Sequence, residues 1–228
     1  MFVWRRIIGF LFVGILVISM GWGMRAAQAA VFSSEVSGQR LQPSGMDLTY
    51  PVLLGHKHAA ADEKINADIY AYVVAQCQLA VQKKAHIRMN YTIHYENAQI
   101  LSLQLTTYSY VSGTAHGEYM VHGVVYDKSD GERIPLTAAL EPLSPAALQP
   151  MVMSGEARVF AADGAKRLLP ERVPGYLLDT VPADYYLDME NGEPVAGLLL
   201  ADAPHALGLL HILLPARFLT KDIRERMD

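Results

Sequence analysis

The chain has 228 residues, of which 51% are hydrophobic and 18% charged, and this composition excludes a disordered or fibrous protein. The net charge of −4 argues against a nucleic-acid-binding protein, and the single cysteine, Cys77, excludes an internal disulfide bond and a cysteine-rich zinc site. The sequence has no phosphate-binding loop, HExxH or GxSxG motif, so we expect no cofactor, no metal ion and no enzymatic activity.

Residues 1–29 have the pattern of an export signal. Arg5 and Arg6 precede an apolar run over residues 7–24, and Ala27-Gln28-Ala29 suits cleavage by a signal peptidase. The run is also close to the roughly 20 residues that span a bilayer, so an uncleaved anchor is the alternative and the only expected contact with a membrane. In both cases we expect the remainder to lie outside the cytoplasm, where its 16 basic and 23 acidic residues give a net charge of −7.

The next residues predict a β-sheet with one long helix. Residues 31–45 are polar and are expected to lead into an edge strand. Over residues 60–82, apolar residues recur at every fourth position, which is typical of an amphipathic helix, and Cys77 lies on this apolar stripe. The strands are predicted over residues 47–54, 86–96, 99–110, 118–126 and 132–136.

The central hairpin, over residues 86–110, carries the clearest pattern. Apolar and polar residues alternate strictly in its first strand, as in a half-buried antiparallel strand. We expect the polar face to be solvated, the alternative being a flat recognition surface. In the return strand we expect Leu101, Leu103 and Leu105 to point inward and Ser102 and Gln104 to point outward.

The second half predicts short helices and a second hairpin. Ser144 followed by a proline is typical of a helix start, and helix-like sequence continues to about residue 162. Pro150 and Gly155 interrupt it, which predicts two short helices or one kinked helix. Strands are expected at 185–188 and 194–200 around an Asn-Gly turn and at 209–214, followed by a charged tail over 220–228. The predicted class is α+β, an antiparallel sheet with helices packed on one face.

Several motifs resemble one family of extracytoplasmic modules. Residues 31–140 resemble the module attached to the peptidoglycan deacetylase PdaC, and residues 141–228 resemble the ectodomain of the lysozyme-sensing anti-sigma factor RsiV. We expect the two regions to form one interlocked unit. The first resemblance rests on Ile100-Leu101-Ser102-Leu103, Tyr108-Ser109-Tyr110 and Gly113-Thr114-Ala115-His116-Gly117, and the second on Tyr185-Tyr186-Leu187, Asn191-Gly192 and Ala203-Pro204-His205-Ala206-Leu207-Gly208.

The resemblance implies a bare binding module. The sigma-binding region of RsiV and the catalytic domain of PdaC have no counterpart in the sequence, and the best-understood role of the shared module is to bind lysozyme-type proteins. The candidate binding residues are His116, Tyr108, Tyr110, Pro204 and His205. His116 has two interpretations. It is either a general base or metal ligand, or a side chain that hydrogen-bonds the backbone of its own loop and fixes the shape of that loop.

Three functions compete. The first is a non-enzymatic cell-envelope module that binds a lysozyme-type muramidase or peptidoglycan. The second is an envelope glycan hydrolase in which His116 acts with a carboxylate such as Asp127 or Glu118. The third is a structural envelope subunit, which predicts a large exposed apolar patch.

Overall fold

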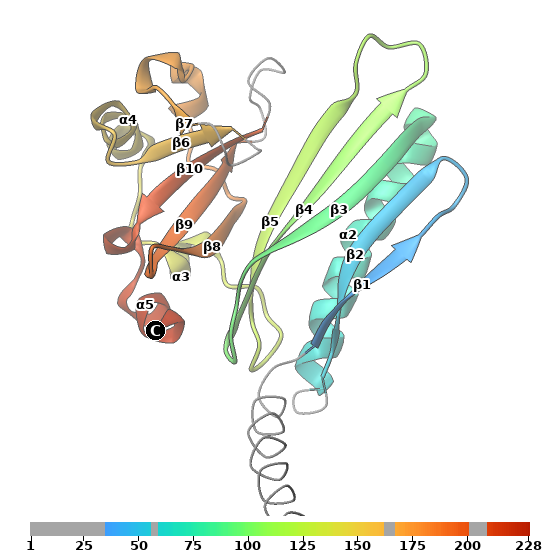
Figure 1. Ribbon diagram of the computed structural model, residues 1–228, viewed down its shortest axis with the longest axis horizontal. Coiled ribbons are helices and arrows are strands. Elements are labelled where there is room, and N and C mark those ends of the chain that lie inside the picture. The colour runs from blue at the N-terminus through green and yellow to red at the C-terminus, as the bar shows by residue number, and fades with distance from the viewer. Residues whose placement is uncertain (1–34, 56–58, 162–166, 201–208) are drawn as a thin grey trace, which may run out of the picture. The chain divides into compact units, whose positions relative to one another are not determined.

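Two five-stranded β-sheets form the framework of the computed structural model, which describes residues 35–55, 59–161, 167–200 and 209–228 (Figure 1). Residues 35–228 form one compact unit. The predicted α+β class is confirmed, although the strands divide between two sheets. Among the described helices, none is both long enough and apolar enough to cross a membrane.

The N-terminal sheet has the order β1-β2-β3-β4-β5 and is covered on one face by helix α2. Alternation in the strands and a four-residue repeat in the helix bring the apolar side chains of both to this interface, where Ile65 and Ile69 pack with Leu103. Cys77 is half-buried at the edge of this core. The elements are β1 (Glu35–Leu41), β2 (Met46–Leu54), α2 (Ala59–Lys83), β3 (Ala85–Glu96), β4 (Ile100–Val111) and β5 (Glu118–Asp127).

One pairing in this sheet is parallel. The chain leaves β2, passes through α2 and enters β3 beside β2, so that Leu48 pairs with Met89 in a parallel register. A helical crossover of this length is the usual way to connect parallel neighbours. The expectation of a wholly antiparallel sheet therefore fails at this point.

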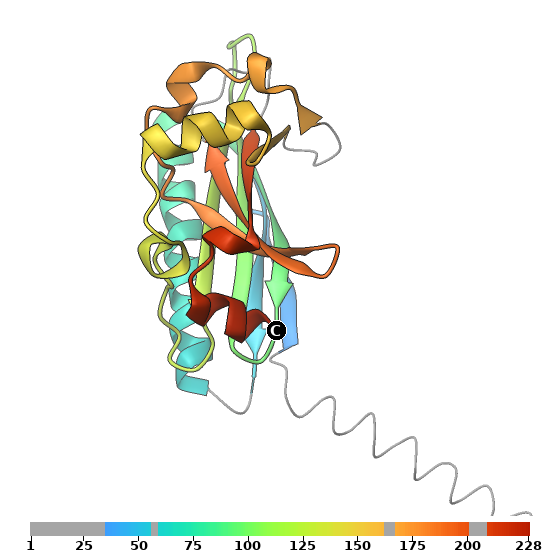
Figure 2. The same cartoon turned by 90° about the vertical axis from the view of Figure 1, so that its left-hand side faces the viewer.

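The C-terminal sheet has the order β7-β6-β10-β9-β8, with β10 in the centre as its apolar sequence predicts. Helices α3, α4 and α5 and two 3-10 helices, η1 and η2, pack on one face over a core that includes Leu148, Leu198 and Ile212 (Figure 2). The strands are β6 (Arg158–Ala161), β7 (Arg167–Leu168), β8 (Tyr185–Glu190), β9 (Glu193–Leu200) and β10 (Leu210–Pro215). The helices are α3 (Leu136–Ala139), α4 (Pro145–Ser154), η1 (Pro170–Arg172), η2 (Gly175–Leu178), η4 (Ala216–Phe218) and α5 (Lys221–Met227).

Two predictions for the segment between residues 132 and 162 are wrong. Residues 132–136 make only a single bridge, between Arg133 and Tyr126, before α3 begins. Helix α4 is capped by the Ser144 side chain and passes through Pro150, but it ends at Gly155, whose φ of 78° is left-handed, and the chain continues as β6. The helix-like sequence was expected to continue beyond Gly155, but residues 158–161 form a strand instead.

The two sheets meet at β8, which packs against β3, β4 and β5. Ser102 and Gln104 do lie on the opposite face of β4 from its leucines, but this face is buried here rather than solvated. The Ser102 hydroxyl accepts a hydrogen bond of 2.7 Å from the Leu187 backbone N–H. At Gly123 an added Cβ would lie 2.5 Å from the Tyr185 carbonyl oxygen, so only glycine allows this close approach.

Helix α5 fastens the two halves together. Its Arg226 side chain donates to an Asp127 carboxylate oxygen at 2.9 Å, and the Asn97 side chain donates to the Arg226 carbonyl oxygen at 2.7 Å. Tyr95 donates to the carbonyl oxygen of Met227 at 2.9 Å. The charged tail predicted from the sequence is thus a docked helix.

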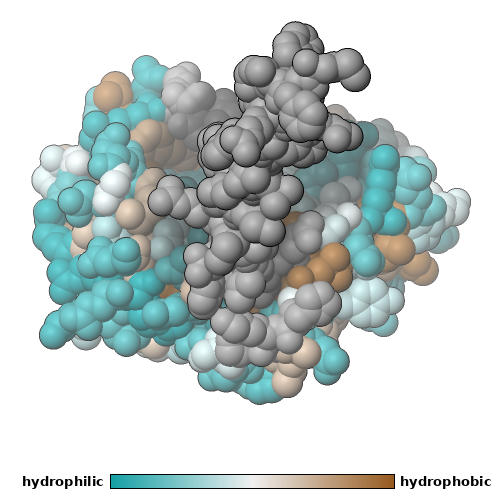
Figure 3. Space-filling model, turned by 60° about the horizontal axis from the view of Figure 1, so that its bottom comes forward, coloured by the Kyte–Doolittle hydropathy of each residue, from teal (hydrophilic) through white to brown (hydrophobic). Residues whose placement is uncertain are grey.

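The described surface is mainly hydrophilic on the face shown in Figure 3. Hydrophobic residues on that face form small, separate patches. This view therefore gives no support to the structural-subunit hypothesis, which predicts a broad apolar area.

Candidate functional site: a tyrosine surface at the β4–β5 loop

The β4–β5 loop and the end of β4 that leads into it carry three of the five predicted binding residues, His116, Tyr108 and Tyr110 (Figure 1). Tyr108 and Tyr119 are cross-strand partners on the face of the N-terminal sheet opposite α2, and their ring centroids lie 4.8 Å apart at an angle of 49°. Tyr119 is 52% exposed. We call Tyr108, Tyr110, Tyr119 and His116 the tip surface.

Gly117 makes room for one of these rings. A Cβ at this position would lie 2.4 Å from the Tyr108 ring and 2.6 Å from the Ser109 carbonyl oxygen. Since the first of these distances is far below van der Waals contact, any other residue would push the ring away. The glycine of the Ala-His-Gly sequence therefore sets the position of Tyr108.

His116 is exposed and lies in a closed loop. Its Nδ1 atom is 3.3 Å from the Gly117 carbonyl oxygen, and the Thr114 hydroxyl lies 3.1 Å from the His116 carbonyl oxygen and 2.7 Å from that of Val111. Tyr110 reaches the same loop, its hydroxyl being 3.5 Å from the Thr114 carbonyl oxygen. These contacts agree with the interpretation in which His116 helps to fix the loop.

The carboxylates suggested as partners of His116 are engaged elsewhere. Asp127 stands at the far end of β5, where Ser129 and Arg226 hydrogen-bond its carboxylate. Glu118 lies 3.6 Å from the ammonium group of Lys83. Pro204 and His205, the remaining predicted residues, lie outside the described part of the chain.

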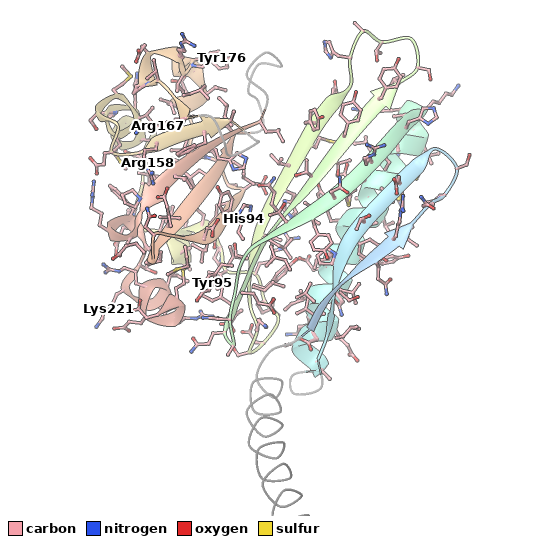
Figure 4. All side chains as sticks on the ribbon, in the orientation of Figure 1. His94, Tyr95, Arg158, Arg167, Tyr176 and Lys221 are labelled. Carbon is pink, nitrogen blue, oxygen red and sulfur yellow. The ribbon has the colours of Figure 1, made fainter. Side chains whose placement is uncertain are left out.

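A second polar cluster, missed by the sequence analysis, lies where the sheets meet (Figure 4). The His94 ring of β3 stacks on the Tyr186 ring of β8, with centroids 3.6 Å apart, and its Nδ1 is 3.2 Å from an Asp188 carboxylate oxygen. On the other side of Tyr186, the Nδ1 of His211 lies 3.2 Å from the tyrosine hydroxyl. Burial, together with the smaller effect of the neighbouring His94, lowers the pKa of His211 to about 4.

Another histidine–aspartate pair joins the sheets at the edge of β5. The Nδ1 of His122 lies 2.6 Å from a carboxylate oxygen of Asp184, and the His122 ring stacks on Tyr72 of α2 with centroids 4.7 Å apart. The Nε2 atoms of His94, His122 and His211 are buried without a hydrogen-bond partner. Within the described ranges, no three histidine, cysteine or acidic side chains gather in a way that could hold a metal ion.

Comparison with known proteins gives a likeness in structure only. No protein-family model matches the chain, and no curated protein matches its sequence. The crystal structure of a DUF3298-family member from Bacteroides fragilis is 13% identical and superposes with a TM-score of 0.56, covering 86% of this chain and 96% of that one. The chain shares its fold with a DUF3298 protein.

The DUF3298 family occurs in proteins of the RsiV and PdaC type, so the resemblance noted in the sequence is supported at the level of the fold. A second DUF3298-family structure, from Pseudomonas aeruginosa, is 10% identical, has a TM-score of 0.48 and covers 84% of this chain and 94% of that one.

Proposed function

We propose that the chain is an exported, non-enzymatic binding module of the cell envelope. Its proposed partner is a lysozyme-type muramidase, with peptidoglycan as the second candidate. The observation that carries the proposal is the pair formed by the exposed Tyr119 and the half-buried Tyr108, held over Gly117 at the free end of a long hairpin. A rigid tyrosine pair offers a large contact area and loses little conformational entropy on binding.

Charge favours the muramidase over the glycan. The part of the chain after the predicted signal has a net charge of −7, and lysozymes are typically basic, whereas peptidoglycan is an anionic polymer. Opposite net charges speed the encounter of two proteins, most strongly at low ionic strength. The fold shared with a DUF3298 protein supports the same class of function through the resemblance to RsiV.

The proposal gives His116 a role in shaping the surface. Its loop is closed by hydrogen bonds from Thr114, and the two carboxylates considered for acid–base chemistry are bound to other side chains. We therefore propose no catalytic role for this residue.

Calorimetric titration of the purified chain with lysozyme and with soluble peptidoglycan fragments, at low salt, tests the proposal. Tyr119→Ala should weaken binding by about tenfold or more, as expected for an interface tyrosine. Tyr70→Ala is the matched control, because Tyr70 is also 52% exposed and also has a tyrosine neighbour, Tyr50, but lies on α2. Absence of binding to both probes, or an equal loss in the control, would contradict the proposal, as would turnover of peptidoglycan by the purified chain.

A further inference from the structure

Two adjoining cavities lie beside the outer edge of β5, away from the tip surface. The first, of about 410 Å³, lies between β5, the segment leading into α3 and the start of β8. The second, of about 290 Å³, continues from it along α3, and the two share Leu136 and Thr137. We call the two cavities together the α3 groove. The volume of the first cavity alone is within the range of roughly 300–1,000 Å³ that is typical of ligand-binding clefts.

The floor of the groove includes the unpaired edge of a strand. β5 is the last strand of its sheet, and within the described ranges its outer edge makes only the single bridge to Arg133. The Val125 carbonyl oxygen points to that edge, since it accepts a hydrogen bond from the Ile134 N–H at 2.8 Å. Because alternate residues of a strand face the same side, the backbone N–H and C=O of Gly123 also point to the edge.

Beyond this edge the groove becomes apolar. The second cavity is lined by Leu136, Leu140, Pro142, Leu143 and Val181, with Thr137 and Glu141 as its polar members. A strand edge next to apolar pockets is the arrangement by which proteins bind extended peptides, with backbone hydrogen bonds for affinity and pockets for selectivity.

The charges in the groove are predominantly negative. Its lining includes the carboxylate of Glu141, the carboxylate of Asp184 paired with the lining residue His122 at 2.6 Å, and one cation, Arg133. The Arg133 guanidinium is already neutralised, because it donates to both oxygens of Asp68, at 2.6 and 2.9 Å. Among the described residues, no cation forms an ion pair with Glu141, so a basic occupant would complement the groove.

We propose that the α3 groove binds an extended segment of a partner protein in which aliphatic side chains alternate with lysine or arginine. The segment hydrogen-bonds the Gly123 backbone, places an aliphatic side chain among Leu140, Leu143 and Val181, and brings a cation to Glu141. This site is separate from the tip surface and does not depend on the function proposed for it.

Fluorescence anisotropy with short labelled peptides and the full chain tests this inference. The probe is Val-Leu-Lys-Val-Lys, compared with Val-Leu-Glu-Val-Glu, Ser-Ser-Lys-Ser-Lys and an N-methylated form of the first that lacks backbone donors. The basic aliphatic peptide should bind with a Kd at or below about 1 mM, and each comparison peptide should bind at least about fivefold more weakly.

Matched variants locate the site. Glu141→Lys should weaken binding of the probe at least about fivefold by reversing the charge, and Thr137→Arg should weaken it similarly by obstructing the junction of the two cavities. Glu63→Lys on α2 and Gln149→Arg on α4, which are exposed positions outside the groove, should leave binding unchanged. Tyr119→Ala should also leave binding of the peptide unchanged. Failure of the function proposed for the tip surface can therefore be distinguished from failure of the proposal for the α3 groove.

Three results would overturn the inference. They are no binding of the basic aliphatic peptide, equal binding of the acidic one, and equal losses in the groove variants and their controls. Binding of the N-methylated peptide as strongly as its parent would also count against it, because the strand edge would then contribute nothing.

Discussion

Lowering the pH should destabilise the fold through His211. This side chain is only 8% exposed, and burial lowers its pKa from 6.5 to about 4. Between these two pH values His211 is protonated in the unfolded chain but neutral in the folded chain. The free energy of unfolding therefore falls as the pH falls from about 6.5 to about 4. A difference of two to three pKa units corresponds to about 3 kcal/mol, most of it lost by about pH 4.5.

Replacement of His211 by asparagine isolates this effect. An asparagine amide can still meet the Tyr186 hydroxyl, which lies 3.2 Å from Nδ1, but it does not titrate. Urea unfolding of both proteins at a series of pH values between 7 and 4.5 gives the difference in unfolding free energy, in which the other titrating groups largely cancel. That difference should change by about 2–2.5 kcal/mol in favour of the variant as the pH falls from 7 to 4.5.

The control is His86→Asn, at the opposite end of β3 from His94 and exposed. A stability difference between the wild type and His211→Asn that does not vary with pH would refute the reasoning. It would show that the folded protein accepts the proton on His211 without cost.

Further substitutions test the other contacts. Gly117→Ala should displace the Tyr108 ring, which lies 2.4 Å from the new Cβ, and lower lysozyme affinity several-fold in calorimetry. Because the new Cβ also meets the Ser109 backbone carbonyl oxygen at 2.6 Å, the variant should lose about 2–4 kcal/mol of stability, as at Gly123, and an unchanged affinity of the folded variant would show that the position of the ring does not matter for binding. Gly123→Ala should destabilise the fold by about 2–4 kcal/mol in urea unfolding, because the new Cβ meets a β8 carbonyl oxygen at 2.5 Å, and a wild-type midpoint would contradict the close approach. Arg226→Ala should cost about 1–2 kcal/mol by removing its bonds to Asp127, and a smaller loss would mean that α5 is held by its apolar face alone.

Most strands could be predicted because their signals are local. Each of these signals depends on residues that are close in sequence: the alternation in β3, the leucines of β4 and the Asn191-Gly192 turn. The structure confirms all three, and the two turn residues have φ of 53° and 83°. In the tip surface, Tyr108, Tyr110 and His116 were candidates from the sequence, whereas Tyr119 was missed, although the register of one hairpin places it against Tyr108.

What could not be predicted depends on contacts between distant segments. Ser102 has the sequence context of a solvated position, and only the packing of β8 against β4 buries it. The cluster of His94, Tyr186 and His211 draws on three strands with no shared local pattern. The interruption expected at Gly155 is the end of the helix, because its left-handed conformation turns the chain into the strand over residues 158–161, which pairs with β10 far along the sequence.

β4 serves two interiors at once, because Leu101 packs under α2 while its neighbour Ile100 packs with the helices of the C-terminal sheet. If the chain were divided near residue 140, the fragments would no longer share this core. Each fragment would then expose to water the apolar side chains that the other fragment covers in the intact protein. We therefore expect the two regions to unfold together, in a single cooperative transition.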